Sequence, residues 1–92
     1  MVIAQGAVVT KIERLPKSID LYSVRFTFIE SGEEINCQIK NSYQNTNGIK
    51  SRKFPVVYER SNVRNAFILI KPDDFASFNM QFPDSLSTSE IR

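Results

Sequence analysis

The chain has 92 residues, of which 41% are hydrophobic and 24% charged, so we expect one compact domain rather than a disordered chain or a membrane span. Twelve Lys and Arg stand against ten Asp and Glu, and the resulting net charge of +2 is too small to name a partner. The chain has no His, one Cys and three dispersed Gly. Histidine-dependent triads, histidine-ligated zinc, an intrachain disulfide and a glycine-rich phosphate loop are therefore excluded.

The first expected strand covers residues 6–13, which are rich in β-branched side chains. Two later stretches, residues 22–28 and 34–40, alternate apolar and polar side chains with a period of two. Residues 30–33 between them contain Gly32, which suits a turn with positive φ. The pattern predicts a β-hairpin.

Residues 41–52 are polar and form a predicted loop, which is long for a compact domain and therefore either mobile or used in binding. Two more strands are expected at residues 54–58 and 66–70. Pro55 has no N–H to donate, so we expect the fourth strand to lie at an edge or its proline to lie near the strand start.

The C-terminal part shows one candidate helical turn at residues 73–78, where Pro72 and two carboxylates suit a first turn. Phe75, Phe78, Met80 and Phe82 are expected to pack on the sheet as a lid. We expect one β-barrel domain over residues 1–83, followed by a flexible tail over residues 84–92.

Five short strands with frequent turns predict an all-β fold, a small five- to six-stranded barrel or sandwich of OB-like or SH3-like size, with a short C-terminal helical turn or lid. Strand periodicity does not distinguish the two topologies. The predicted core consists of Val9, Tyr22, Val24, Phe26, Phe28, Ile35, Cys37, Ile39, Val56, Ile68 and Ile70.

Catalytic chemistry is not expected. The paired carboxylates Glu33–Glu34 and Asp73–Asp74 are adjacent in sequence, so their side chains point in different directions. Cys37 lies in a strand pattern and is interpreted as a small buried hydrophobe. We therefore expect no catalytic residues, no metal site and no cofactor.

Positive charge is concentrated between Lys50 and Arg64, where five cations accompany one carboxylate. Such a surface, with nearby tyrosines, suits a protein partner or stacking and phosphate contacts to a single-stranded nucleic acid. The same charges also suit a solvated strand border that resists aggregation. The candidate partner-binding residues are Tyr43, Lys50, Arg52, Lys53, Tyr58, Arg60 and Arg64.

The order of these elements resembles a bacterial family of small β-barrel domains of unknown function. The resemblance rests on the alternating run from Tyr22 to Phe28, the turn at Gly32, Gly48-x-Lys50 and the stretch from Phe54 to Asn62. Members of that family are often attached to transmembrane segments and lie outside the bilayer. The resemblance implies a non-enzymatic role in a membrane-associated, extracytoplasmic protein, and it carries over no site residues.

Together these observations predict a non-enzymatic interaction or accessory module, a soluble extracytoplasmic part of a bacterial envelope protein with a protein partner. An OB-like or SH3-like single-stranded nucleic-acid-binding domain that uses Tyr58 and the cations from Lys50 to Arg64 is the alternative. The sequence shows no signal peptide, and its apolar runs fall far short of the roughly 20 residues of a spanning helix.

Overall fold

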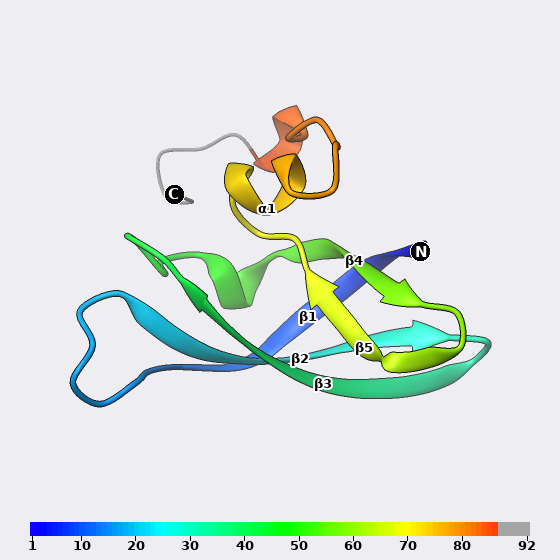
Figure 1. Cartoon of the computed structure of the whole chain (residues 1–92), viewed down its shortest axis with the longest axis horizontal. Helices are drawn as coiled ribbons and strands as arrows, with labels where there is room; N and C mark the ends of the chain where they lie inside the picture. Colours follow the sequence, from blue (N-terminus) through cyan, green and yellow to red (C-terminus); the bar gives the residue numbers. More distant parts are fainter. Residues whose placement is uncertain (87–92) are drawn as a thin grey trace.

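The computed structural model describes residues 1–86, which fold into a five-stranded antiparallel barrel with a short helical segment at its C-terminal end (Figure 1). The elements are β1 (Val2–Arg14), β2 (Leu21–Glu30), β3 (Glu33–Ser42), a 3-10 turn (Ile49–Ser51), β4 (Lys53–Glu59), β5 (Asn62–Ile68), α1 (Pro72–Ala76) and a second 3-10 turn (Asp84–Leu86). The all-β prediction with a short C-terminal helix is therefore confirmed. The last six residues of the expected tail, 87–92, lie outside the described residues.

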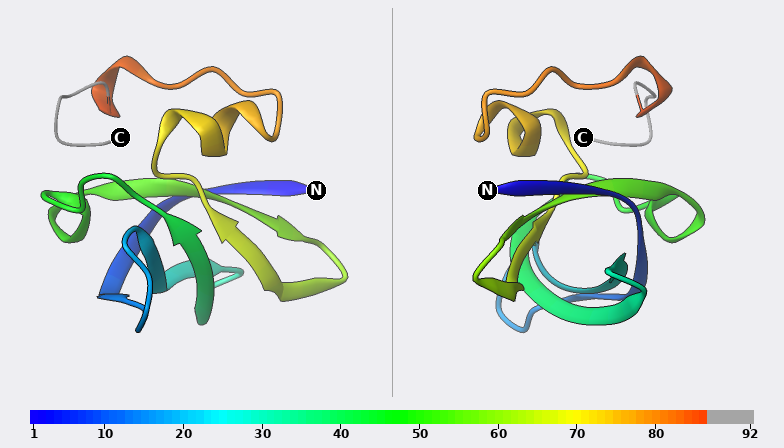
Figure 2. Two further views of the ribbon diagram at one scale, coloured as in Figure 1. Left: turned by 60° about the vertical axis from the view of Figure 1, so that its left-hand side comes forward. Right: turned by 90° about the vertical axis from the view of Figure 1, so that its right-hand side faces the viewer.

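The strands follow the order β3-β2-β1-β4-β5, in which β1 to β3 form a meander and β4 returns through a long connection to lie beside β1. This is a Greek key. The two outer strands, β3 and β5, curl toward each other and close the sheet into a nearly complete barrel (Figure 2). The structure therefore decides between the two topologies that the periodicity left open, in favour of a barrel over a sandwich of two sheets.

The predicted hairpin is formed by β2 and β3, which pair without interruption from Leu21 opposite Ser42 to Glu30 opposite Glu33. Its two-residue turn has positive φ at both Ser31 (51°) and Gly32 (81°), as the turns favoured in tight hairpins require. The uninterrupted register keeps the apolar side chains of one parity on the inside of the barrel.

β4 lies between β1 and β5, so the expectation that Pro55 marks an edge strand is wrong and the alternative position near the strand start holds. The register between β1 and β4 shifts between Ala4 and Ala7, where Gly6 has a φ of 80°. Pro55 lies opposite this bulge. A residue without an N–H is tolerated in an inner strand because the ladder is already interrupted there.

Most of the predicted core is buried, and Phe28 lies between Phe26 and Tyr58 with ring centroids 6.4 and 5.4 Å away. The buried members are Val9, Val24, Phe26, Phe28, Ile35, Val56, Ile68 and Ile70. Tyr22, Cys37 and Ile39 are only half-buried and pack at the margin of the core. Two of these three, Cys37 and Ile39, lie on β3, whose outer side has no paired strand within the described residues.

The C-terminal segment covers the outside of β4, so β4 is buried on both faces (Figure 2). This cover explains why Val57 and Leu69 are buried, although the predicted core did not include them. Leu86 is 7% exposed and belongs to the core cluster, so packing continues past Pro83.

The segment after β3 makes more backbone and core contacts than its polar sequence suggests. β3 continues to Ser42, and the backbone N–H of Tyr43 donates to the carbonyl of Asp20 at 2.9 Å. Ile49 then places its side chain in the core from a 3-10 turn that begins after Gly48, whose φ is 81°. Two buried anchors therefore divide the predicted loop of residues 41–52 into shorter pieces.

Candidate functional site

Both tyrosines of the predicted site belong to the core. Tyr43 is 2% exposed and Tyr58 is 8% exposed. Burial, followed by the nearby negative charge of Asp74, raises the pKa of Tyr43 above its ordinary value. Neither ring offers a face on which a nucleic-acid base can stack, so a platform built on Tyr43 and Tyr58 is not formed.

The predicted cations divide between the two ends of β4. Lys50 and Lys53 are exposed and Arg52 is half-buried before or at the start of the strand. Arg60 lies in the turn after β4, and Arg64 lies on β5. The seven residues of β4 separate the two groups by about 20 Å. The fold therefore does not gather these residues into one site.

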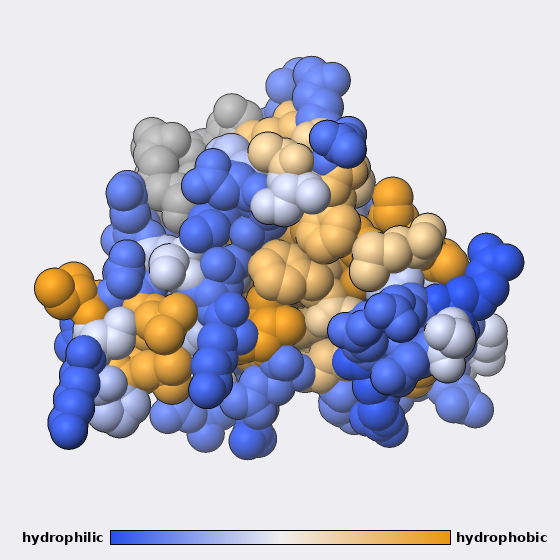
Figure 3. Space-filling model, viewed as in Figure 1, coloured by the Kyte–Doolittle hydropathy of each residue, from blue (hydrophilic) through white to orange (hydrophobic). Residues whose placement is uncertain are grey.

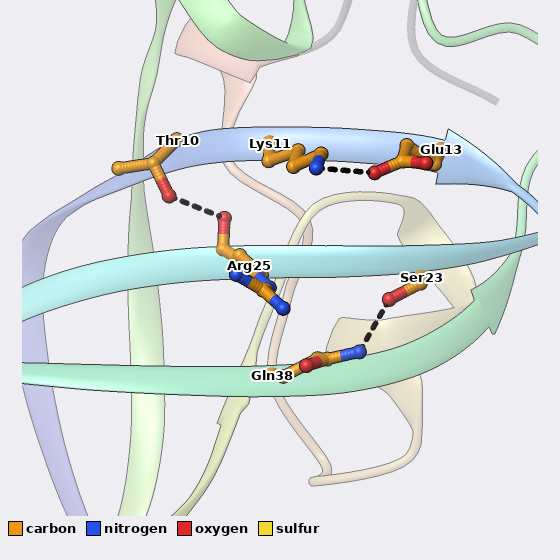
Figure 4. Close-up of polar contacts among 6 residues, drawn as sticks. All are labelled: Thr10, Lys11, Glu13, Ser23, Arg25 and Gln38. Atoms are coloured by element: carbon orange, nitrogen blue, oxygen red, sulfur yellow. Dashed lines mark hydrogen bonds and ion pairs between the residues drawn. The ribbon is translucent and has the colours of Figure 1, made fainter.

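A different group of cations gathers on the outer face of β1 and β2, where it lines a hollow of about 320 Å³. We call this the cationic hollow. Figure 4 shows the face, with Lys11 and Glu13 on β1, Arg25 on β2 and Gln38 on β3. The lining residues are Lys11, Glu13, Arg14, Leu15, Pro16, Ser23, Arg25 and Gln38.

Hydrogen bonds and an ion pair order this outer face. Gln38 Nε2 donates to Ser23 Oγ at 2.6 Å, and Lys11 Nζ lies 2.7 Å from Glu13 Oε1 (Figure 4). The hydrogen bond and charge of Lys11 lower the pKa of Glu13 below its ordinary value. Glu13 therefore offsets part of the positive charge, while Arg25 projects from β2 toward solvent.

The barrel closes where β3 meets β5, along a line that we call the seam. Arg64 Nη1 donates to the backbone carbonyl of Asn36 at 3.2 Å, and Cys37 Sγ donates to the carbonyl of Arg64 at 3.5 Å. Within residues 1–86 no backbone hydrogen bond joins the two strands. Side chains rather than a β-ladder therefore bridge the seam.

Beside this bridge lies a second hollow of about 350 Å³, which we call the seam hollow. The rings of Phe67 and Phe78 meet in it, with centroids 6.0 Å apart and planes tilted by 48°. Figure 3 shows apolar side chains gathered in the centre of this face of the molecule. The lining residues are Met1, Gln38, Ile39, Val57, Arg64, Asn65, Ala66, Phe67 and Phe78.

Gln38 joins the hollows of the outer face. It lines the cationic hollow, the seam hollow and a third depression of about 380 Å³ that also includes Arg25 and Asn36. A path therefore runs over the outside of the barrel from a cationic region on β1 and β2 to a region with two half-buried aromatic rings. We take this outer-face path as the candidate site.

The most buried charged group lies elsewhere, at the junction of β3 and α1. Asp74 is 4% exposed, and its carboxylate accepts hydrogen bonds from Asn41 Nδ2 (2.9 Å), Ile70 N (3.0 Å) and Lys71 N (3.1 Å). The ammonium group of Lys71 donates to the Ser42 carbonyl and lies 5.3 Å from the Tyr43 ring centroid. These contacts fasten the C-terminal segment to the barrel.

The described residues hold no group of three or more Cys, Asp or Glu side chains that could bind a metal ion. Partial burial raises the pKa of the Cys37 thiol, against an opposing effect of the Arg64 charge. Cys37 is therefore a neutral thiol at pH 7. Over residues 1–86 no helix is long and apolar enough to cross a bilayer.

Sequence reasoning missed the outer-face path, although part of its signal was present. Ser23, Arg25 and Gln38 occupy the polar parity of the predicted hairpin. What the sequence alone did not show is that β1 pairs with β2 and brings Lys11 beside Arg25. Of the predicted site residues, only Arg64 lines this path.

Comparisons with protein-family models, with curated proteins and with solved structures find no match for this chain.

Proposed function

We propose that this protein is a non-enzymatic interaction module that binds a partner protein in the seam hollow. The observation that carries the proposal is a hollow lined by two phenyl rings and a rim of polar side chains, at the one junction of the barrel where neighbouring strands lack a ladder within the described residues. Exposed strand edges and apolar surface beside them are common features of protein-binding sites.

Two further considerations support a non-enzymatic role. The buried carboxylate of Asp74 is held by three donors that orient it toward the fold rather than toward a substrate. The family that the sequence resembles adds the proposal that the module belongs to an extracytoplasmic part of a membrane-attached protein.

The test is to select random 12-residue peptides on the immobilised protein and to map the selected peptides by amide chemical shifts of the labelled chain. The proposal expects the largest shifts at Gln38, Arg64 and Phe67. Shifts centred on Lys50 and Lys53, or a failure to select any peptide that binds in solution, would overturn it.

Single-stranded nucleic acid is the second candidate, favoured by Lys11, Arg14 and Arg25 around the cationic hollow. Phosphate contacts make affinity fall steeply with salt, and a 12-residue oligothymidine measured by fluorescence anisotropy over a salt series provides the probe. This candidate expects Arg25→Glu to weaken binding more than Lys53→Glu. Equal effects of the two substitutions, or no binding at low salt, would exclude it.

A further inference from the structure

We infer that the partner segment binds in an extended conformation, adding as a strand to the seam edge of β3 and placing apolar side chains on Phe67 and Phe78. The inference rests on the proposed function, and it adds the conformation and chemistry of the ligand. The occupant is a short extended peptide segment of another protein, apolar at alternate positions and carrying an acidic side chain.

The backbone of β3 provides the first argument. β3 pairs with β2 alone among the described strands, and in an antiparallel pair alternate residues turn their N–H and C=O groups away from the partner strand. The Asn36 carbonyl accepts a hydrogen bond from Arg64 across the seam, which shows that Asn36 belongs to the outward set. By the two-residue period, Gln38 and Lys40 also turn their backbone groups toward the seam.

The apolar surface beside this edge provides the second argument. Gln38 and Ile39 of β3 line the same hollow as Ala66 and Phe67 of β5 and Phe78 of the C-terminal segment. A strand paired with Gln38 and Lys40 would therefore lie against the two phenyl rings. Main-chain hydrogen bonds with pockets for alternate side chains define strand addition as a mode of peptide recognition.

The positive charge of Arg64 provides the third argument, because it favours peptides that carry an acidic side chain. Arg64 contributes the only charged side chain among the described residues that line the seam hollow. Its guanidinium donates one hydrogen bond to Asn36, and guanidinium groups have further donors that suit a carboxylate. A ligand with Asp or Glu beside its apolar residues would complement this rim, whereas a ligand with Lys or Arg there would be repelled.

Peptides selected on the protein provide the probe. Each residue of the tightest-binding selected peptide is replaced in turn by its N-methyl form, which removes one backbone donor. Strand addition expects losses of about tenfold or more at every second residue and small effects at the intervening residues, because only one set of N–H groups faces β3. Equal effects along the peptide would overturn the inference while leaving a peptide site in the seam hollow.

Charge reversal tests the acidic preference separately. Arg64→Glu is expected to weaken the selected peptide about tenfold, and a peptide with its acidic residue changed to Lys should regain affinity for this variant. Lys53→Glu provides the control, since Lys53 is exposed at the far end of β4. Recovery of affinity would show that Arg64 contacts the acidic residue of the peptide, whereas a structural loosening of the seam would weaken both peptides alike. Failure to recover affinity would overturn the proposal that Arg64 binds the acidic residue. A dimer of the protein that the selected peptides dissociate would instead identify a second copy as the occupant of the seam hollow.

Discussion

Asn41 and Asp74 are joined by a hydrogen bond of 2.9 Å from Nδ2 to Oδ1, although 33 residues separate them in the sequence. The bond ties the end of β3 to the first turn of α1. The other carboxylate oxygen of Asp74 accepts from the backbone of Ile70 and Lys71, just before the helix. One side chain thus fixes the direction in which the chain leaves β5 and covers β4.

Replacing Asp74 with Ala should destabilise the protein by about 3 kcal/mol, because several donors near it would lose a charged acceptor. Chemical denaturation monitored by fluorescence or circular dichroism measures the loss. Asp73→Ala is the matched control, since Asp73 is exposed in the same helical turn and should change stability by no more than about 0.5 kcal/mol. Equal losses in both variants would contradict the role of Asp74.

Stability should fall as the pH rises above about 10, because the pKa of Tyr43 is raised in the folded protein above its value of about 10 in the unfolded chain. The folded state keeps the phenol proton that the unfolded state loses. The contribution is fully present below pH 10 and is lost as the pH increases toward the folded-state pKa. Thermal unfolding from pH 8 to 11 should show a shallower decline in Tyr43→Phe than in the native chain. Identical slopes would contradict this prediction.

Gly6→Ala should cost about 1–2 kcal/mol, because Gly6 has a φ of 80° and other L-residues are strained there. A Cβ at this position would meet no atom within 4 Å, so the cost comes from the backbone alone. Gly6→Asn should cost less, because Asn tolerates positive φ better than Ala. Denaturation midpoints of the two variants test this order, and a more stable Ala variant would refute the bulge geometry.

Leu86→Ala should destabilise the protein by about 2 kcal/mol or more, because the Leu86 side chain belongs to the core. Asp84→Ala in the same 3-10 turn is the control, since Asp84 is exposed. A loss at Leu86 no greater than at Asp84 would contradict this prediction and favour the expected domain boundary at Pro83.

The sequence predicted the hairpin and its inner face well because the alternation within residues 22–28 and within residues 34–40 is local, and only a short turn separates the two stretches. The sequence predicted burial poorly where it depends on contacts between residues distant in the chain. Val57 and Leu69 are buried because the C-terminal segment covers β4 from the outside, and Tyr43 is buried beside Lys71. The periodicity of β4 and of residues 41–52 does not reveal these contacts with the C-terminal segment.

Prediction of the candidate site from the sequence was limited in the same way, because it depends on which strands pair. The predicted cations are close in sequence, yet β4 separates Lys50 and Lys53 at its start from Arg60 and Arg64 at its end. Lys11 and Arg25 are distant in sequence, yet the β1–β2 ladder pairs them directly. Charge clustering along the chain therefore suggested a surface that the strand order divides, while the pairing of strands created another.

Hydrogen exchange at the Gln38 and Lys40 amides tests the central claim most directly. In the free protein these amides should exchange rapidly, because they face the seam without a β-ladder across it. With a selected peptide bound, the claim predicts that exchange slows at both amides while the amides of Lys50 and Lys53 keep their rates. Unchanged exchange at Gln38 and Lys40 when the peptide is bound would contradict strand addition at the seam.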